Sequence, residues 1–586
     1  MIVQLDRIVF DHTPGAAAND ALSIRIDRAS TAPDWIRGAT DTSYAAYALV
    51  PALDQQLTIH ADFSFPDPLL ASATPIEVRA TATDQNDAIL GNVSPTTVPP
   101  GGGRVVLPLT DGQLWNRGIG RYEVGWEWQF RVTPGAQWID LEHTHHVVYV
   151  TLDEPKAPWS QAPGGPHALW LWIRALDWAC AWANSVTLTS TGASGAAKKA
   201  LGRLEMGLFN LGRRDVVPLQ YLDAGGAEYT QDFPDRVFFL SAFLDLLDGT
   251  PAPDRGTQVN CSDCASALAT FANALGCDTV QKQIDHQDDN MLRTNRIVLI
   301  GESDPPETHW FSYHEVVVRE RASDKALLVH DATLMIDTDR DPTREGEGHE
   351  FDLAEGMELG QFVEDPGTFR YAHRLVQPEQ WAAGALLDIS FRCIDECMGV
   401  ANPPDPSTQR RYQRIRSEID RLVALPGPEW VPDLTPPVIQ GFTLYDRVNN
   451  PWRLAAMKRL VSHSAEFFYV GTGKGATRDQ RMRISMAYCR TSPDANEAFA
   501  WLLAQRETPH TTIGTTGERL GDASFGTQRN AGLFFMRGNA IVQMLSTGRE
   551  RAPLPNFARE MDDKIKRLPQ RTPDRQVVRE DEKVST

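Results

Sequence analysis

Three side chains of the types that together activate a sulfur nucleophile occur in order along the middle of the chain. Cys261 lies in the segment NCSDCASALATFANALG, His314 in YHEVVV and Asp331 in VHDAT. A thiolate attacks carbonyl carbon atoms, an imidazole takes up and returns the proton, and a carboxylate holds the imidazole in one orientation. These residue types therefore predict a nucleophilic thiol, if the fold brings them together.

The cysteine is expected at the N-terminus of a helix. Apolar or small residues recur every three or four positions at Cys261, Ala265, Leu268, Ala272 and Leu275. This spacing is typical of one buried helix face, with Asn260 as the N-cap and Gly276 as the stop. Backbone N–H groups and the helix dipole at that end favour a thiolate and can hold an oxyanion. We therefore expect the sulfur at the edge of a buried face.

The histidine and the aspartate are expected on two strands of one hairpin. Residues 313–320 (YHEVVVRE) and 326–331 (ALLVHD) flank the turn RASDK. A hairpin centred between Ala322 and Ser323 places His314 directly opposite Asp331, within reach of a hydrogen bond. Alternation along the second strand points His330 to the other face of the sheet. The same hairpin favours His314 over His309 as the base.

The three motifs, taken in order, resemble the transglutaminase-like core within the papain-like group, shared by transglutaminases, peptide N-glycanases and bacterial homologues. The matching residues are Cys261 with Ala265, the helix end Ala274-Leu275-Gly276, His314 before Val316-Val317-Val318, and Asp331-Ala332-Thr333. The resemblance covers 257–337 tightly and 165–395 loosely. It implies a papain-like fold there, with Cys261 as nucleophile, His314 as general base and Asp331 as orienting residue.

The chain departs from that family's pattern at several positions. Asn260 stands where the family usually has glycine, and His-Glu-Val replaces the frequent His-Ala-Trp. Some members use an upstream tryptophan as an oxyanion partner, whereas no tryptophan lies between Trp182 and Cys261. Gln258 and Gln220 are the candidate oxyanion donors in its place.

The rest of the chain predicts an α+β multidomain protein. Short alternating strands separated by turn residues predict an N-terminal antiparallel, immunoglobulin-like β-sandwich. FRYAHRLV and LLDISFRCI are expected strands after the central motifs, and mixed helices and strands follow a proline-rich stretch. The expected units are a β-sandwich (1–155), a transglutaminase-like catalytic domain (165–395), a helical and proline-rich linker (396–437), a C-terminal α+β domain (438–555) and a charged tail (556–586).

Composition excludes some kinds of partner. The 586 residues carry a formal net charge of −20, which repels nucleic-acid phosphates. No apolar run approaches the roughly 18 residues that span a membrane, and no signal peptide is visible. With seven cysteines in this length, reduced thiols are expected. We expect a cytoplasmic protein, with signal-independent export left open, that acts on a protein or peptide and uses no cofactor.

Metal sites are weaker interpretations of several other residues. Cys261 and Cys264, together with Cys393 and Cys397, could form a four-thiolate zinc site or a redox dithiol. His143, His145 and His146 could bind a metal on one strand. The acidic run that starts at Asp337 lacks the glycine and glutamate of a calcium loop. Packing and solvated roles suit these residues better, and no metal site is predicted.

The sequence thus predicts thiol-dependent acyl transfer on a protein or peptide amide. Attack by Cys261 on a glutamine side chain or a peptide bond would give a thioester, which water or an amine then resolves. Transamidation, deamidation and proteolysis all stay open. The alternative is a non-catalytic binding or scaffold protein that keeps the fold.

Overall fold

The structure is a computed structural model of the chain. It describes all residues except 1–2, 13–18, 67–74, 84–87, 162–168, 189–191, 216, 223–226, 232–236, 251–255, 287–290, 303–305, 339–349, 361–369, 378–383, 390–392, 395–405, 425, 450–458, 474–475, 479, 507–509, 513–519, 528–530, 549 and 572–586. Within this described part, no helix has the length and apolar character needed to cross a membrane.

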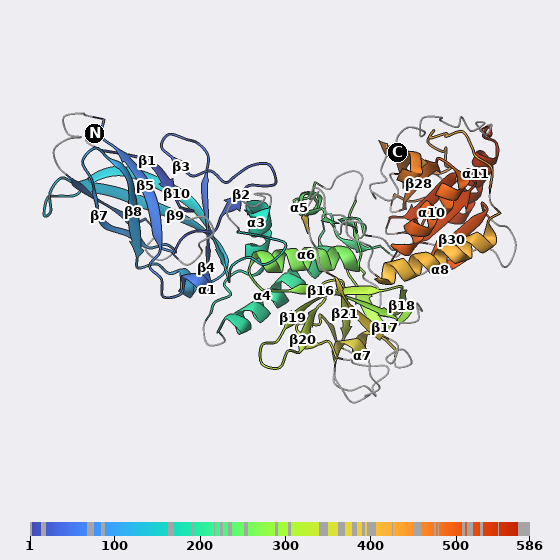
Figure 1. Cartoon of the computed structure of the whole chain (residues 1–586), viewed down its shortest axis with the longest axis horizontal. Helices are drawn as coiled ribbons and strands as arrows, with labels where there is room; N and C mark the ends of the chain where they lie inside the picture. Colours follow the sequence, from blue (N-terminus) through green and yellow to red (C-terminus); the bar gives the residue numbers. More distant parts are fainter. Residues whose placement is uncertain are drawn as a thin grey trace, which may run out of the picture.

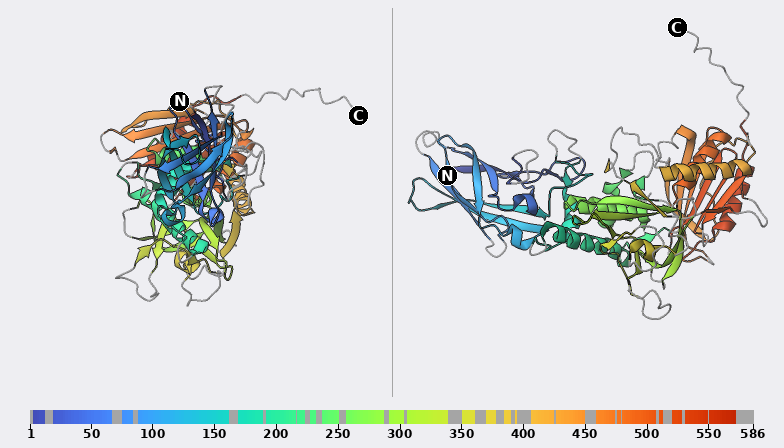
Figure 2. Two further views of the ribbon diagram at one scale, coloured as in Figure 1. Left: turned by 90° about the vertical axis from the view of Figure 1, so that its left-hand side faces the viewer. Right: turned by 60° about the horizontal axis from the view of Figure 1, so that its bottom comes forward.

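The chain forms an elongated arrangement of three units in sequence order (Figure 1). A β-rich N-terminal unit, a mixed central unit and a C-terminal α+β unit follow one another along the longest axis, as a second view also shows (Figure 2). The α+β multidomain class is thus confirmed. One buried apolar cluster runs through the N-terminal and central units, so these two share a continuous core. The expected domain boundaries stay predictions.

The N-terminal unit is a nine-stranded sheet folded over on itself. Its order is β3 (Trp35–Ile36), β1 (Gln4–Val9), β5 (Thr58–Ser64), β8 (Gly103–Thr110), β7 (Asn92–Val98), β6 (Ile76–Ala82), β9 (Gly120–Arg131), β10 (Ile139–Thr151) and β4 (Ser43–Ala48). Phe63 of β5 meets Trp128 of β9 at 6.3 Å between ring centroids, although three strands separate them in the sheet. The two halves therefore pack face to face around aromatic side chains.

One strand pair departs from the expected antiparallel sandwich. Strands β10 and β4 run parallel, with His146 paired to Ser43. Parallel pairing needs a long connection, and most of the N-terminal unit lies between these two strands.

The central unit surrounds one helix with sheets and other helices. Helix α6 (Cys261–Ala274) contacts β19 (His314–Glu320) and β16 (Val280–His286) as well as helices α3 (Ile173–Trp182) and α4 (Gly192–Phe209). Its main sheet has the order β23 (Met357–Glu358), β20 (Leu327–His330), β19, β16 and β24 (Gly384–Ile389). A second sheet has the order β18 (Glu307–Phe311), β17 (Leu292–Leu299), β21 (Leu334–Asp337) and β22 (Phe351–Asp352). All residues of α6 are buried, so the expectation of one buried face is wrong.

Short elements complete the central unit. They are β11 (Leu171–Trp172), which pairs with β2 (Ile24–Arg25), helix α5 (Leu240–Leu247), the parallel pair β12 (Gln220–Tyr221) and β15 (Gln258–Val259), and the sheet of β13 (Thr230–Gln231), β14 (Val237–Phe238) and β25 (Cys393–Ile394). FRYAHRLV, expected as a strand, instead contains helix α7 (Tyr371–Leu375). Its buried apolar residues Tyr371, Ala372 and Leu375 follow helical spacing, and α7 packs on β17 and β21.

The C-terminal unit is a seven-stranded antiparallel sheet with helices on both faces. Its order is β26 (Phe442–Asn449), β27 (Val461–Gly471), β28 (Arg481–Cys489), β32 (Ala540–Ser546), β31 (Gly532–Arg537), β30 (Ala523–Thr527) and β29 (His510–Thr512). Helices α8 (Pro406–Leu422) and α10 (Ser492–Ala504) share one buried cluster with alternate sheet residues. Helix α11 (Leu554–Lys566) shares another cluster with the residues in between.

Two segments that we expected outside the C-terminal domain contribute to this core. Helix α8, which we placed in a linker, contributes Ile415 and Ile419 to the cluster under α10. Helix α11 begins at Leu554 and continues into the expected charged tail (556–586), where it buries Phe557, Met561 and Ile565. In both helices, apolar residues at helical spacing form a narrow stripe that packs in the buried clusters of this unit. The many charged residues around this stripe make the segments resemble solvent-exposed ones in the sequence. Residues 572–586 of the expected tail, and most of the expected helix PWRLAAMKRLVS, lie outside the described residues.

Candidate active site

The first turn of α6 is held by a reciprocal cap. The side-chain oxygen of Asn260 accepts a hydrogen bond from the Asp263 N–H at 3.1 Å, and the Asp263 carboxylate accepts one from the Asn260 N–H at 3.3 Å. This capping box makes Cys261 the first helical residue. Gly276 follows the helix with a φ of 81°, as the sequence predicts for the C′ position.

His314 and Asp331 form a buried hydrogen-bonded pair. Nε2 of His314 lies 2.8 Å from Oδ2 of Asp331, and both side chains are almost fully excluded from solvent. His314 is the first residue of β19, and Asp331 directly follows β20. These two strands are antiparallel neighbours, as the sequence predicts.

The expected register of this hairpin is nevertheless wrong. Val317 pairs with His330, whereas the predicted register pairs Val317 with Leu328. A shift of two positions keeps every side chain on its expected face, because side chains alternate along a strand. His314 and Asp331 are therefore diagonal neighbours, and they still meet because the imidazole reaches across the diagonal with its far nitrogen, Nε2.

The Asp331 carboxylate has further partners that the sequence did not reveal. The hydroxyl of Tyr371 donates to Oδ2 at 2.6 Å, and the backbone N–H of Thr333 donates to Oδ1 at 2.9 Å. Burial, and then the negative charge of Asp331, raise the pKa of Tyr371 well above its usual value; Cys261 adds to this rise. Tyr371 lies in FRYAHRLV, which the sequence predicts as a strand, so nothing in the sequence indicates that its hydroxyl binds Asp331.

A second buried acid–histidine pair supports the backbone of Asp331. Glu205 of α4 places Oε2 at 2.7 Å from Nδ1 of His330, and its Oε1 accepts the Asp331 N–H at 2.9 Å. His330 thus points away from Asp331, as alternation predicts. Glu205 has no exposed side-chain surface. The sequence gives one sign of this role for Glu205. It is a charged residue at a position of an alanine-rich helix where the helical spacing predicts burial.

Aromatic stacking holds the imidazole of His314. The ring of Phe311 lies 5.5 Å from it with an interplanar angle of 19°. His309 stacks on the same phenylalanine at 6.2 Å and lies 3.9 Å from a Glu302 oxygen. The structure therefore brings His314, and not His309, to Asp331.

All described cysteine side chains are free thiols and are buried; they are Cys180, Cys261, Cys264, Cys277 and Cys489. Cys261 has no exposed surface, so our expectation of a sulfur at the edge of the buried face is wrong. Burial raises the pKa of Cys277 to about 12, and it also raises those of Cys180 and Cys489. These three residues are poor nucleophiles for that reason.

The alternative metal sites gain no support from the described residues. Among these residues, no group of three or more histidine, cysteine, aspartate or glutamate side chains could hold a metal ion. The ring nitrogens of His146 lie 2.6 Å from Ser43 Oγ and 2.9 Å from Thr144 Oγ1. Cys397 and most of the acidic run after Asp337 lie outside the described part.

The two candidate oxyanion residues are neighbours. Gln220 and Gln258 are paired positions of the parallel strands β12 and β15. Gln258 is buried and lies in the strand that leads directly into α6. Their role stays a prediction.

Comparison with solved structures gives distant similarities, whereas the two comparisons by sequence give none. No protein-family model matches the chain, and no curated protein matches it. The crystal structure of red sea bream transglutaminase is similar at 10% sequence identity and a TM-score of 0.25, over 74% of this chain and 73% of that chain. A TM-score of this size does not establish a common fold.

Proposed function

We propose that the chain is a transglutaminase-like enzyme that transfers the acyl group of a protein or peptide amide through a thioester on Cys261. The observation that carries the proposal is the buried 2.8 Å contact between His314 and Asp331. His314 begins one strand of the sheet on which the helix that starts with Cys261 packs, and Asp331 directly follows the neighbouring strand. A thiol, a base and an orienting acid in one water-poor cluster are the parts that thiol catalysis requires.

The hydrogen bond to Asp331 decides which ring nitrogen works as the base. Because Asp331 binds Nε2 of His314, the neutral imidazole carries its proton there and Nδ1 accepts the thiol proton. The sulfur attacks the amide carbonyl carbon, and the imidazolium returns the proton to the departing nitrogen as the C–N bond breaks. Water or an amine then attacks the thioester, loses a proton to His314, and releases the thiol.

The oxyanion formed in each step needs hydrogen-bond donors. The first N–H groups of a helix have no acceptor within the helix, and those at the start of α6 lie beside the sulfur. Gln258 or Gln220 would add a side-chain donor. In the described conformation Cys261 and His314 have no exposed surface, so a polypeptide substrate requires neighbouring segments to move first.

Ammonia release tests this function. The full chain is incubated with a glutamine-containing peptide, with and without a primary amine, and ammonia and peptide mass are followed. We expect ammonia release by the wild type and by C264A, which is the matched control on the same helix, but not by C261A. Amine incorporation indicates transamidation, a gain of acid indicates deamidation, and a new peptide terminus indicates proteolysis. Equal activity of C261A and wild type would refute the thioester.

Selective alkylation separates the enzyme from the scaffold alternative. Iodoacetamide near pH 6 should modify Cys261 faster than the other cysteines, and H314A should lose this preference. If Cys261 reacts no faster than Cys264, the chain has no activated thiol, and a binding or scaffold role becomes the better interpretation.

A further inference from the structure

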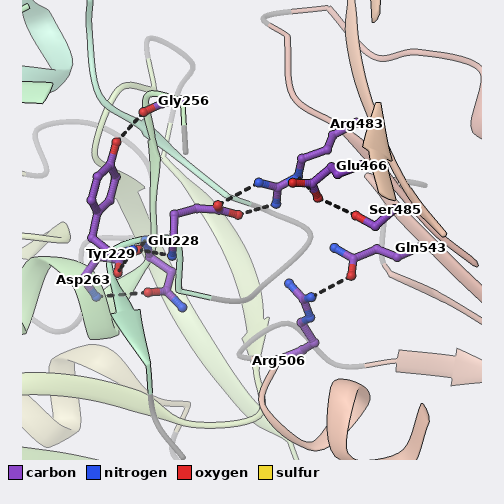
Figure 3. Close-up of polar contacts among 10 residues, drawn as sticks. Glu228, Tyr229, Gly256, Asp263, Glu466, Arg483, Ser485, Arg506 and Gln543 are labelled. Carbon is purple, nitrogen blue, oxygen red and sulfur yellow. Dashed lines mark hydrogen bonds and ion pairs between the residues drawn. The ribbon is translucent and has the colours of Figure 1, made fainter. Parts of the chain in front are cut away.

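The C-terminal unit is joined through Glu228 to the end of α6 that carries Cys261. Arg483 of β28 donates from Nη1 to Glu228 Oε2 at 2.7 Å, and its Nη2 donates to the other oxygen of the same carboxylate (Figure 3). Both side chains are largely buried. Glu466 lies 3.6 Å from Nε of Arg483 and accepts a hydrogen bond from Ser485. A two-pronged arginine–carboxylate contact of this kind fixes orientation as well as distance.

The backbone at Glu228 continues this contact to the helix. The N–H of Glu228 donates to Oδ2 of Asp263 at 2.9 Å, and the N–H of Tyr229 donates to Oδ1 at 2.8 Å (Figure 3). Asp263 is also the residue that completes the capping box with Asn260. One carboxylate therefore joins the first turn of α6 to the segment that Arg483 holds.

Asp263 depends on these donors. Burial raises the pKa of Asp263 to about 7, and the N–H groups of Glu228 and Tyr229 act against this rise. The negative charge of Glu228 would raise the pKa of Asp263 further, and Arg483 offsets that charge. Without the arginine, two carboxylates would share a buried site next to the cysteine, which is costly for both.

The same unit also reaches the strand of the histidine. The guanidinium of Arg411, in α8, lies 4.6 Å from the ring centroid of Tyr313. Tyr313 precedes His314, and its hydroxyl lies 3.4 Å from Oγ of Ser262, the residue after Cys261. Arg411 in turn donates to the carbonyl oxygen of Ala504 at 3.0 Å, at the end of α10. Two separate contacts thus converge on the same turn of α6.

We propose that Arg483 and Glu228 are positioning residues through which the C-terminal unit holds the first turn of α6, and with it the thiol of Cys261. The inference rests on the proposed function of that thiol. It makes the C-terminal unit a part of the reactive site. It predicts that loss of the contact changes how the reactivity of the Cys261 thiol depends on pH, even though neither residue touches the reacting atoms.

The pH profile of Cys261 alkylation in the full chain tests the inference. Modification by iodoacetamide is measured by peptide mass spectrometry, and the midpoint of the profile is compared because altered access scales the whole curve without moving its midpoint. We expect R483M to raise the midpoint by about half a unit to one unit, which is the order of a helix-end contribution. R483K, which keeps the charge and loses the two-pronged contact, should give a smaller shift.

Two further variants distinguish positioning from other effects. The double variant R483M/E228Q restores charge balance without restoring the anchor, so it should keep the raised midpoint. R537M is the matched control: Arg537 makes a two-pronged contact with Asp562 in the same unit, away from α6. It should leave the midpoint unchanged.

Three results would overturn the inference: an unchanged midpoint in R483M and R483K, full recovery in the double variant, or an equal shift in R537M. The proposed function fails separately, if Cys261 of the wild type reacts no faster than Cys264.

Discussion

The carboxylate of Asp331 accepts hydrogen bonds from three different groups: the His314 ring, the Tyr371 hydroxyl and the Thr333 N–H. A buried carboxylate needs such donors, because its charge is costly where water is excluded. Its backbone is held in addition by Glu205. The imidazole is thus placed by an acid that cannot rotate away.

Asp331→Asn should lower the rate of ammonia release by a factor on the order of 10² to 10⁴, the usual size of a general-base contribution. The amide can keep the geometry, but it no longer stabilises the imidazolium. Initial rates give the result, and T333V serves as the control because it keeps the backbone donor to Asp331. A rate within threefold of wild type would remove Asp331 from the mechanism.

Tyr371→Phe should reduce the unfolding free energy by about 1–3 kcal/mol, since the buried carboxylate loses a donor. We expect the rate to fall about tenfold, which is less than for D331N, because His314 keeps its own bond. Denaturant unfolding and initial rates measure the two effects. Y149F is the matched control, since Tyr149 of the N-terminal unit makes an equal 2.6 Å bond to Asp177 of α3. It should leave the rate unchanged.

Helix α6 shows how an element can be buried on every side and still carry polar residues. Most of its polar positions have a partner: Ser266 meets Thr230, Asn273 holds Thr279, and Asp263 holds the segment at Glu228. Small residues fill most of the other positions, so sheet and helices can approach closely. The polar residues resemble a solvent-facing side in the sequence, but they satisfy the polar groups of neighbouring segments.

Asp263 should make stability depend on pH. Its pKa is raised from 3.8 to about 7 in the folded chain, so the protonated form is favoured by folding. This contribution is complete below the unfolded value and is lost as the pH rises through the folded value. Between these two values, the unfolding free energy of wild type should fall relative to that of D263N by up to about 1.4 kcal/mol per pH unit. Denaturant unfolding across this range checks the slope, and parallel curves for the two proteins would contradict it.

At the scale of the whole molecule, α6 joins the three units. Its N-terminal end meets the C-terminal unit through Glu228 and Arg483. At its other end, the N–H groups of Leu152 and Asp153, from the N-terminal unit, both donate to the carbonyl oxygen of Leu275 at 3.1 Å. Figure 1 shows the helix lying between the two flanking units. Displacement of either flanking unit would therefore shift the helix that carries Cys261.

Gly276→Ala tests the N-terminal junction. Gly276 has a φ of 81°, and a Cβ there would lie 2.6 Å from the backbone of Asp153. Gly249 is a matched control, because it has a φ of 82° and nothing within 4 Å of an added Cβ. G249A should cost about 1–2 kcal/mol from backbone strain alone. G276A should cost clearly more, because two units must separate locally. Denaturant unfolding measures both losses of unfolding free energy. Equal losses for G276A and G249A would show that the junction accommodates the added Cβ without cost.

Local chemistry in the sequence determined where α6 begins and ends, which two strands form the hairpin, and that His314 and Asp331 share one face. Caps act within one turn of a helix, and side chains alternate with a fixed period along a strand. The register was not determined, since a shift of two positions preserves this alternation and leaves the same faces buried.

Only the tertiary structure decided which other residues meet the site. Tyr371 lies 40 positions from Asp331, Glu205 lies 126 positions from it, and Arg483 lies 255 positions from Glu228. Such contacts leave no periodic trace in the sequence, because they depend on how separate elements pack. For the same reason, the complete burial of Cys261 became visible only once sheet, helices and neighbouring units had closed around the helix.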